Sequence, residues 1–152
     1  MKIRPIILCG GEGTRLWQKT INNEPKQFIN FGGWNLFEKT LKRIKGQQFD
    51  YPIISTNVKY LKKIKFYLKK NKFNKHHIVL EPAKRNTGPA VLSAALVPDI
   101  PNKQPLLFLP SDHLLEKNDI FNKSLIKNSK YLNNKNIFLF GIKPDHPSKE
   151  YG

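Results

Sequence analysis

The chain has 152 residues, of which 39% are hydrophobic and 25% charged, and its formal net charge is +16. This length fits one domain with a single hydrophobic core, and no apolar stretch is long enough to cross a membrane. The single cysteine, Cys9, excludes an internal disulfide and is typical of a reducing compartment, so we expect a cytoplasmic protein.

The large positive charge raises the question of a nucleic-acid partner. Lysines supply most of this charge, and only four arginines occur, Arg4, Arg15, Arg43 and Arg85. Proteins that read nucleic acids rely on the bidentate hydrogen bonds of arginine. We therefore expect no specific nucleic-acid partner, and we expect the scattered lysines to form the solvated faces of helices.

Strand-like and helix-like segments alternate along the chain. Short apolar runs predict strands, and apolar residues at helical spacing predict amphipathic helices. In chain order we predict a strand over 6–9, a helix over 36–44, a strand over 52–55, a helix within 59–75 and a strand over 78–81. There follow a helix that starts after a cap at 86 or 87 and continues through 90–96, a strand over 106–109, a helix capped by Asp119 that extends to 132, and a strand over 136–141. This alternation predicts an α/β fold, a Rossmann-like and mostly parallel sheet with helices on both faces.

A glycine-rich turn, Gly-Gly-Glu-Gly-Thr-Arg over 10–15, directly follows the first predicted strand. Its backbone N–H groups, together with Thr14 and Arg15, could hold an anionic ligand at the carboxyl end of that strand. The turn is neither a dinucleotide-binding fingerprint nor a P-loop. From these residues alone, a tight turn without any ligand is an equally good interpretation.

Four further motifs accompany this turn, and they begin at Pro25 (PKQF), Glu81 (EPAKRNTGPA), Leu109 (LPSDH) and Phe140 (FGIKPDHP). In their order and spacing the five motifs resemble those of the sugar-phosphate nucleotidylyltransferases, and within them the mannose-1-phosphate guanylyltransferase branch. The resemblance implies the nucleotide-diphospho-sugar transferase fold. It also implies transfer of GMP from GTP to mannose-1-phosphate, which gives GDP-mannose and pyrophosphate, with Mg²⁺ as cofactor.

The resemblance also implies roles for individual residues. Arg15 matches the arginine that binds the triphosphate, Lys26 the lysine near the α-phosphate, and Asp112 the aspartate that binds Mg²⁺. Gly10, Gly11 and Gly13 would hold the nucleotide through their backbone N–H groups, and Thr14 belongs to the same turn. Without the resemblance, Lys26 could be one surface lysine among many, and Asp112 an ordinary turn residue.

Glu81 is the candidate for base recognition. Guanine presents two adjacent donors, its ring N–H and its exocyclic amine, and one carboxylate can accept both, so we expect Glu81 to select guanine. Arg85, Asn86 and Thr87 bring donors to the start of the next predicted helix, where they could contact an anion or the ribose. Capping of that helix by Asn86 or Thr87, with Pro89 in its first turn, is the structural alternative.

Two features limit the resemblance. Ile21 stands where the family usually has a second arginine, which puts one phosphate contact in doubt. The resemblance covers residues 1–152 as the nucleotide-binding half, so we expect the sugar-binding half to be absent and the chain alone to turn over poorly. A homo-oligomer or a complementary carboxyl-terminal fragment stays open. So do another sugar-1-phosphate nucleotidylyltransferase and a non-catalytic nucleotide-binding remnant.

Overall fold

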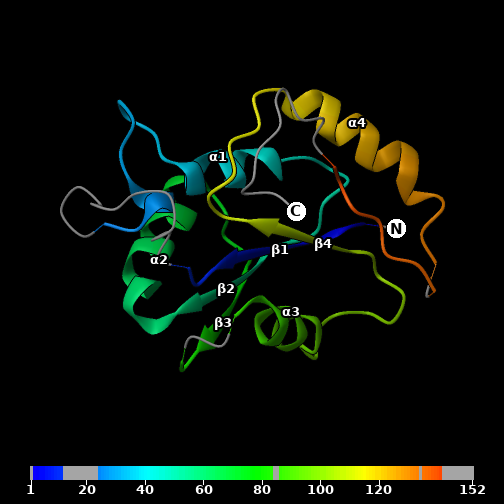
Figure 1. Ribbon diagram of the computed structural model, residues 1–152, viewed down its shortest axis with the longest axis horizontal. Coiled ribbons are helices and arrows are strands. Elements are labelled where there is room, and N and C mark those ends of the chain that lie inside the picture. The colour runs from blue at the N-terminus through cyan, green and yellow to red at the C-terminus, as the bar shows by residue number, and fades with distance from the viewer. Residues whose placement is uncertain (1, 12–23, 84–85, 134, 142–152) are drawn as a thin grey trace, which may run out of the picture.

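The computed structural model describes residues 2–11, 24–83, 86–133 and 135–141, which form a sheet with helices on both of its faces (Figure 1). The sheet has four strands in the order β3-β2-β1-β4, and all three pairings are parallel. The strands are β1 (Arg4–Cys9), β2 (Ile53–Asn57), β3 (His77–Glu81) and β4 (Leu106–Pro110). The predicted α/β Rossmann-like fold is confirmed.

The order of the strands creates a switch point between β1 and β4. The chain moves outward from β1 to β2 and β3, and then returns past β1 to place β4 on its other side. In open parallel sheets, ligands bind at the carboxyl ends of the strands where the order reverses in this way. The topology therefore directs attention to the segments that follow β1 and β4.

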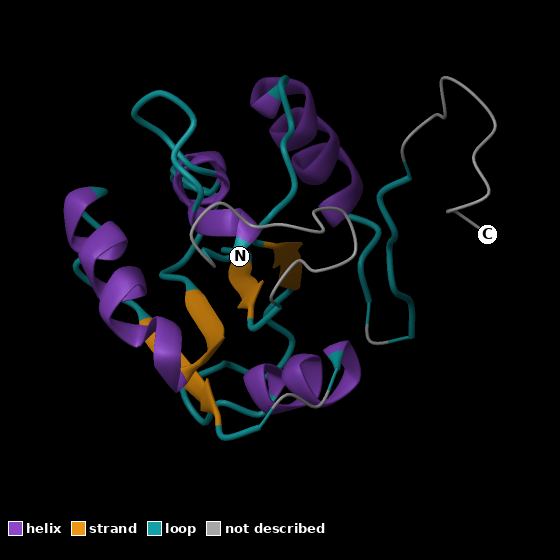
Figure 2. Cartoon of the chain, turned by 60° about the vertical axis from the view of Figure 1, so that its left-hand side comes forward, coloured by secondary structure: helices purple, strands orange, loops and turns teal. Residues whose placement is uncertain are grey.

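The helices divide between the two faces of the sheet, which Figure 2 shows from the side. The helix α3 (Thr87–Ala95) packs through Ala94 on the face formed by Ile6 and Ile53. The opposite face carries the larger core, to which α1 (Leu36–Arg43), α2 (Leu61–Lys70) and α4 (Asn118–Ser129) contribute. Two short 3-10 helices, η2 (Lys26–Phe28) and η3 (Val58–Tyr60), complete the elements of the described residues.

Three sequence expectations differ from the structure. Residues 136–141 form no strand. Ile137 and Leu139 are 89% and 90% exposed, and Phe140 instead packs on Phe121 of α4, with 5.0 Å between the ring centroids. The segment has strand-like residues, but it pairs with no strand of the described residues, and pairing rather than propensity stabilises a strand. Asp119 does not cap α4, because Lys117 is the N-cap residue and Asp119 lies in the first turn. The predicted 59–75 helix becomes η3 and α2, and α2 ends at Lys70.

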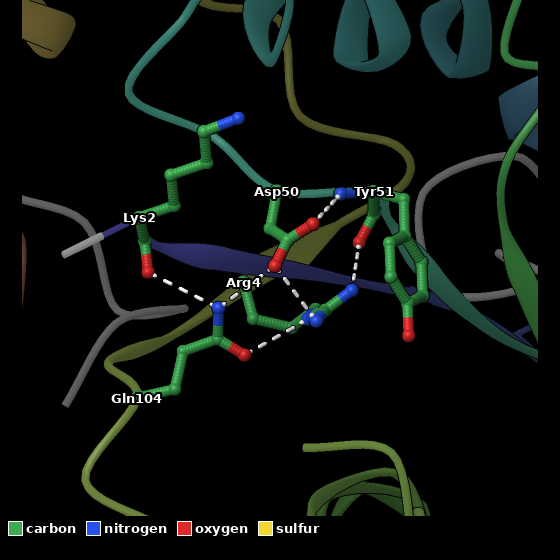
Figure 3. A network of polar contacts seen from close by, with 5 residues as sticks. All are labelled: Lys2, Arg4, Asp50, Tyr51 and Gln104. Atoms are coloured by element: carbon green, nitrogen blue, oxygen red, sulfur yellow. Dashed lines mark hydrogen bonds and ion pairs between the residues drawn. The ribbon is translucent and has the colours of Figure 1, made fainter. Parts of the chain in front are cut away.

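A polar network closes the amino-terminal edge of the sheet, and it is formed by Lys2, Arg4, Asp50, Tyr51 and Gln104 (Figure 3). The Arg4 side chain is 2% exposed and its three nitrogens donate to Gln104 Oε1, the Tyr51 carbonyl and Asp50 Oδ2 at 3.1, 2.9 and 2.8 Å. Gln104 in turn donates to Asp50 Oδ2 and to the Lys2 carbonyl. This Arg4 network joins the start of β1 to the segments that precede β2 and β4.

Candidate functional site

The motif residues gather at the carboxyl edge of the sheet. Gly10 follows the last residue of β1, Glu81 is the last residue of β3, and Asp112 lies just beyond the end of β4. Parallel strands end at the same edge, so three segments that are distant in sequence meet there. In the strand order β3-β2-β1-β4, Glu81 at the end of β3 and Asp112 after β4 lie on either side of the end of β1.

Lys26 and Asp112 face each other across the switch point. Lys26 Nζ lies 3.9 Å from Asp112 Oδ2, and the two side chains are 21% and 35% exposed. This separation is longer than a hydrogen bond, so each group keeps capacity for another partner. A cation and a carboxylate at a switch point form an arrangement that can bind a phosphate and a divalent metal ion.

The local structure explains why Lys26 points toward the edge. Pro25 has an extended backbone and is the N-cap of η2. In this three-residue turn the side chains of Gln27 and Phe28 are buried. Phe28 is 1% exposed and packs on the rings of Phe37, Tyr60 and Tyr67.

Gln27, also in this turn, is 2% exposed, and its amide donates to the carbonyl of Gly11 at 3.1 Å. The motif PKQF therefore anchors the turn in the core through Phe28 and ties it to the glycine segment through Gln27. That anchoring leaves Lys26 at the edge.

Asp112 is positioned by an extension of the β1–β4 pairing. The amide of Ser111 donates to the carbonyl of Leu8 at 3.1 Å, one residue beyond the end of β4, and Ser111 is 4% exposed. Within the described residues, no group of three or more His, Cys, Asp or Glu side chains gathers as a metal site. A single carboxylate that is partly exposed still fits Mg²⁺, because this ion commonly takes one or two carboxylates together with substrate phosphates and water.

Glu81 lies over the beginning of the glycine turn. Its Oε1 accepts a hydrogen bond from Ser55 Oγ of β2 at 2.7 Å. A Cβ atom added to Gly10 would meet Oε1 at 3.2 Å and Oε2 at 3.3 Å, so the carboxylate occupies the space that the missing side chain leaves. At Gly11 an added Cβ would meet no atom of the described residues within 4 Å.

Cys9 is a core residue, as its position at the end of a buried strand predicts. Its side chain is 0% exposed, and burial raises the pKa of the thiol to about 12. Ser111 and Gln27 hydrogen-bond the thiol, which opposes the shift, whereas the charges of Asp112 and Glu81 add to it. A thiol that stays protonated at neutral pH is a poor nucleophile, so Cys9 supplies packing beneath the site.

Asn86 and Thr87 lie at the start of α3, and both are exposed. Asn86 is the N-cap residue, but its side chain makes no capping hydrogen bond, and its backbone has φ 65° and ψ −175°. The predicted capping position is therefore confirmed for Asn86, although its side chain does not make the capping hydrogen bond. Gly13, Thr14, Arg15 and Arg85 lie outside the residues that the structure describes, so their roles stay predictions.

Two residues at this edge were not assigned a role from the sequence, Ser55 and Gln27. Gln27 stands inside the PKQF motif, which offered a signal that it matters. Ser55 offered no such signal, because a serine at the end of an apolar strand shows nothing of the carboxylate that it will meet. Only the pairing of β2 between β1 and β3 brings the Ser55 hydroxyl next to Glu81.

The described helices include none that combines the length and apolarity needed to cross a membrane. Comparison with protein families matches residues 4–152 to the family described as nucleotidyl transferase. A mannose-1-phosphate guanylyltransferase of Escherichia coli is 34% identical over 97% of this chain, which covers 33% of that protein. The chain thus spans about a third of the length of the curated relatives it matches.

Two solved structures are similar to this chain in fold and sequence. A Helicobacter pylori protein described as mannose-6-phosphate isomerase aligns over 86% of this chain and 46% of its own length, with 28% identity and a TM-score of 0.66. A Thermus thermophilus protein described as mannose-1-phosphate geranyltransferase aligns over 88% of this chain and 39% of its own, with 25% identity and a TM-score of 0.65.

Proposed function

The chain belongs to the nucleotidyl transferase family, and from this premise we propose that its carboxyl edge binds Mg²⁺–GTP for the transfer of GMP to mannose-1-phosphate. The observation that carries the proposal is that Lys26, Asp112 and Glu81 lie along this one edge of the sheet, with Lys26 and Asp112 3.9 Å apart at the switch point. The guanylyltransferase named among the curated relatives supports the choice of GTP and mannose-1-phosphate.

In the proposed reaction, an oxygen of the sugar phosphate attacks the α-phosphorus of GTP. A new phosphorus–oxygen bond forms, the bond to the oxygen that bridges to the β-phosphorus breaks, and pyrophosphate leaves. Such a reaction depends on positioning and on neutralising charge more than on covalent help from the protein. The residues at this edge are suited to that task.

The candidate site residues that the structure describes each have a role in the proposed reaction. Lys26 donates to the α-phosphoryl group, on which negative charge builds as the bonds exchange. Asp112 holds Mg²⁺, which neutralises phosphate charge when bound. The backbone of Gly10 and Gly11 lies beneath the nucleotide, where the absence of side chains allows close approach. Glu81 accepts the two donors of guanine.

Nucleotide binding tests the proposal directly. We expect titration calorimetry with Mg²⁺ present to give the order of affinity GTP, then inosine triphosphate, then ATP. Inosine triphosphate lacks the exocyclic amine and so offers Glu81 one donor, whereas ATP offers neither donor in that place. Replacing the carboxylate by an amide in Glu81→Gln should remove most of the preference for GTP.

The matched control is Glu116→Gln, which makes the same change at an exposed glutamate outside the site. It should leave the order of affinities unchanged. Equal affinity of the unaltered chain for GTP, ATP and UTP would contradict the guanine assignment. A preference for UTP or dTTP would instead favour a related nucleotidylyltransferase with a different base.

A further inference from the structure

We propose that Ser55 is a positioning residue for base selection, because it fixes the plane of the Glu81 carboxylate above Gly10. The inference rests on the proposed function and extends it from Glu81 to the residues that hold Glu81 in place. Ser55 belongs to no motif of the sequence, and its role comes from the contacts at the sheet edge.

Ser55 is placed to act on Glu81. Its side chain is 0% exposed and lies in β2 opposite Leu8 of β1 and Val79 of β3. Side chains alternate along a strand, so Glu81, two residues beyond Val79, lies on the same face of the sheet as Ser55. The 2.7 Å bond from Oγ to Oε1 has the short length typical of a hydroxyl that donates to a carboxylate.

The remaining acceptor capacity of Glu81 matches what guanine requires. A carboxylate offers about four lone-pair sites, two on each oxygen. Ser55 occupies one site on Oε1, and no residue described in the structure donates to Oε2. With respect to the described residues, at least one site on each oxygen therefore remains available, and guanine needs one on each. The bond from Ser55 orients the carboxylate without using up this capacity.

Orientation matters because the last torsion of a glutamate side chain is only weakly restricted. A carboxylate that turns freely must lose that freedom when guanine binds with two parallel hydrogen bonds, which weakens the binding. Ser55 removes that freedom before the nucleotide arrives. The benefit falls only on ligands that use both oxygens, so Ser55 should affect selectivity more than general nucleotide affinity.

Gly10 supplies the space that the same carboxylate occupies. An added Cβ would lie 3.2 Å from Oε1 and 3.3 Å from Oε2, which is closer than ordinary van der Waals contact. The backbone of Gly10 is not in the left-handed region, which only Gly32 and Gly33 adopt among the described glycines. Gly10 therefore provides space for the carboxylate and is not needed there for its conformational freedom.

The first experiment compares Ser55→Ala with the unaltered chain in titrations with Mg²⁺–GTP and Mg²⁺–ATP. We expect the Kd for GTP to rise roughly ten-fold, the effect of losing one hydrogen bond to a charged group, and the Kd for ATP to stay the same. Ser55→Thr, which keeps a hydroxyl, should restore the preference for GTP. Thr40→Val, which removes an equally buried hydroxyl in α1 away from the edge, should not change the ratio of the two affinities.

The second experiment moves the carboxylate without touching Ser55. Gly10→Ala should reduce the GTP-to-ATP selectivity, because the new methyl group displaces Glu81. This variant also tests the inference if Ser55→Ala or Ser55→Thr proves too unstable to titrate.

The outcomes separate this inference from the proposed function. If the chain prefers GTP and Glu81→Gln abolishes that preference while Ser55→Ala and Gly10→Ala leave it intact, the proposed function stands and the inference is wrong. A Ser55→Ala variant that loses affinity for GTP and ATP equally would also contradict the inference, because the residue would then be structural. If the unaltered chain shows no preference for GTP, the guanine assignment and this inference are both wrong.

Discussion

The charged residues at the two edges of the sheet differ in burial and in how fully their hydrogen-bonding groups are paired. At the amino-terminal edge, the buried guanidinium of Arg4 has a partner for each of its nitrogens, and its ion pair with Asp50 measures 2.8 Å (Figure 3). At the carboxyl edge, Lys26 and Asp112 are partly exposed and 3.9 Å apart. The same four strands therefore hold one polar network in which each guanidinium nitrogen is paired, and one ion pair whose groups can still bind a further partner.

This difference indicates which charges serve the fold and which serve a ligand. A buried polar group without partners is costly, so a saturated network such as that of Arg4 stabilises the folded state. An ammonium group has three donors, and among the described residues Lys26 directs them only at a distant carboxylate. Substitutions at the two edges should therefore affect different properties.

The largest effect is expected from Arg4→Met, which keeps much of the buried stem but removes the charge. Asp50 and Gln104 then lose their partner, and breaking an ion pair at a buried site typically destabilises a protein by about 3 kcal/mol or more. Urea denaturation followed by circular dichroism would measure the loss. Lys2→Met removes an exposed side-chain charge but keeps the backbone carbonyl through which Lys2 joins the network, so it should change the free energy of unfolding by less than about 0.5 kcal/mol. A comparable loss in both variants would contradict the special role of the network.

The same substitution at the other edge, Lys26→Met, should reverse the pattern. A long, partly exposed ion pair contributes little to stability, so the free energy of unfolding should stay within about 0.5 kcal/mol of the unaltered chain. The Kd for Mg²⁺–GTP should rise about ten- to a hundred-fold, since a hydrogen bond to a charged phosphate is lost. Unfolding as severe as that of Arg4→Met would mean that Lys26 serves the fold and not a ligand.

The pH dependence of stability should also separate the edges. Burial alone would favour the neutral acid at Asp50, but hydrogen bonds from Gln104 and the Tyr51 amide, with the charge of Arg4, hold the pKa of Asp50 below its usual value. A lowered pKa in the folded state adds stability above the pKa of the unfolded chain, and this stability is lost as pH falls through the folded value. The difference in unfolding free energy between the unaltered chain and Asp50→Asn should therefore be largest near neutral pH and should shrink below about pH 4. A difference that stays constant between pH 7 and pH 3 would contradict this.

The sequence predicts the carboxyl edge better than the amino-terminal one. The order of apolar runs predicted all four observed strands, and the residues after β1 and β4 could be placed at one edge because parallel strands end together. Lys26 and Asp112 were found through their motifs. The Arg4 network could not be predicted, since it depends on Asp50 and Gln104 from two irregular segments whose course only the folded chain fixes.

The failures have a common physical origin. Residues 136–141 have the composition of a strand, but a strand needs a neighbour and the local sequence cannot supply one. Ser55 was missed because its partner lies in another strand, 26 residues further along the chain. Local patterns predict which elements form, whereas contacts between elements depend on the complete fold.

The smallest expected effect concerns the backbone of the carboxyl edge at Asn86. Its φ of 65° with ψ of −175° lies in a region that glycine adopts almost exclusively, at a cost of about 1–3 kcal/mol for other residues. Asn86→Gly should therefore stabilise the chain, by about 1 kcal/mol after the extra chain entropy of glycine is subtracted. Urea denaturation would measure this gain, and GTP titration would show whether the side chain is needed. A more stable variant with weaker GTP binding would mean that this edge gives up stability for its ligand, the opposite of the Arg4 network.

The control is Asn102→Gly, an exposed asparagine outside the site whose backbone is not in the left-handed region, and it should not stabilise the chain. A loss of stability in Asn86→Gly would show that the asparagine side chain supports the fold.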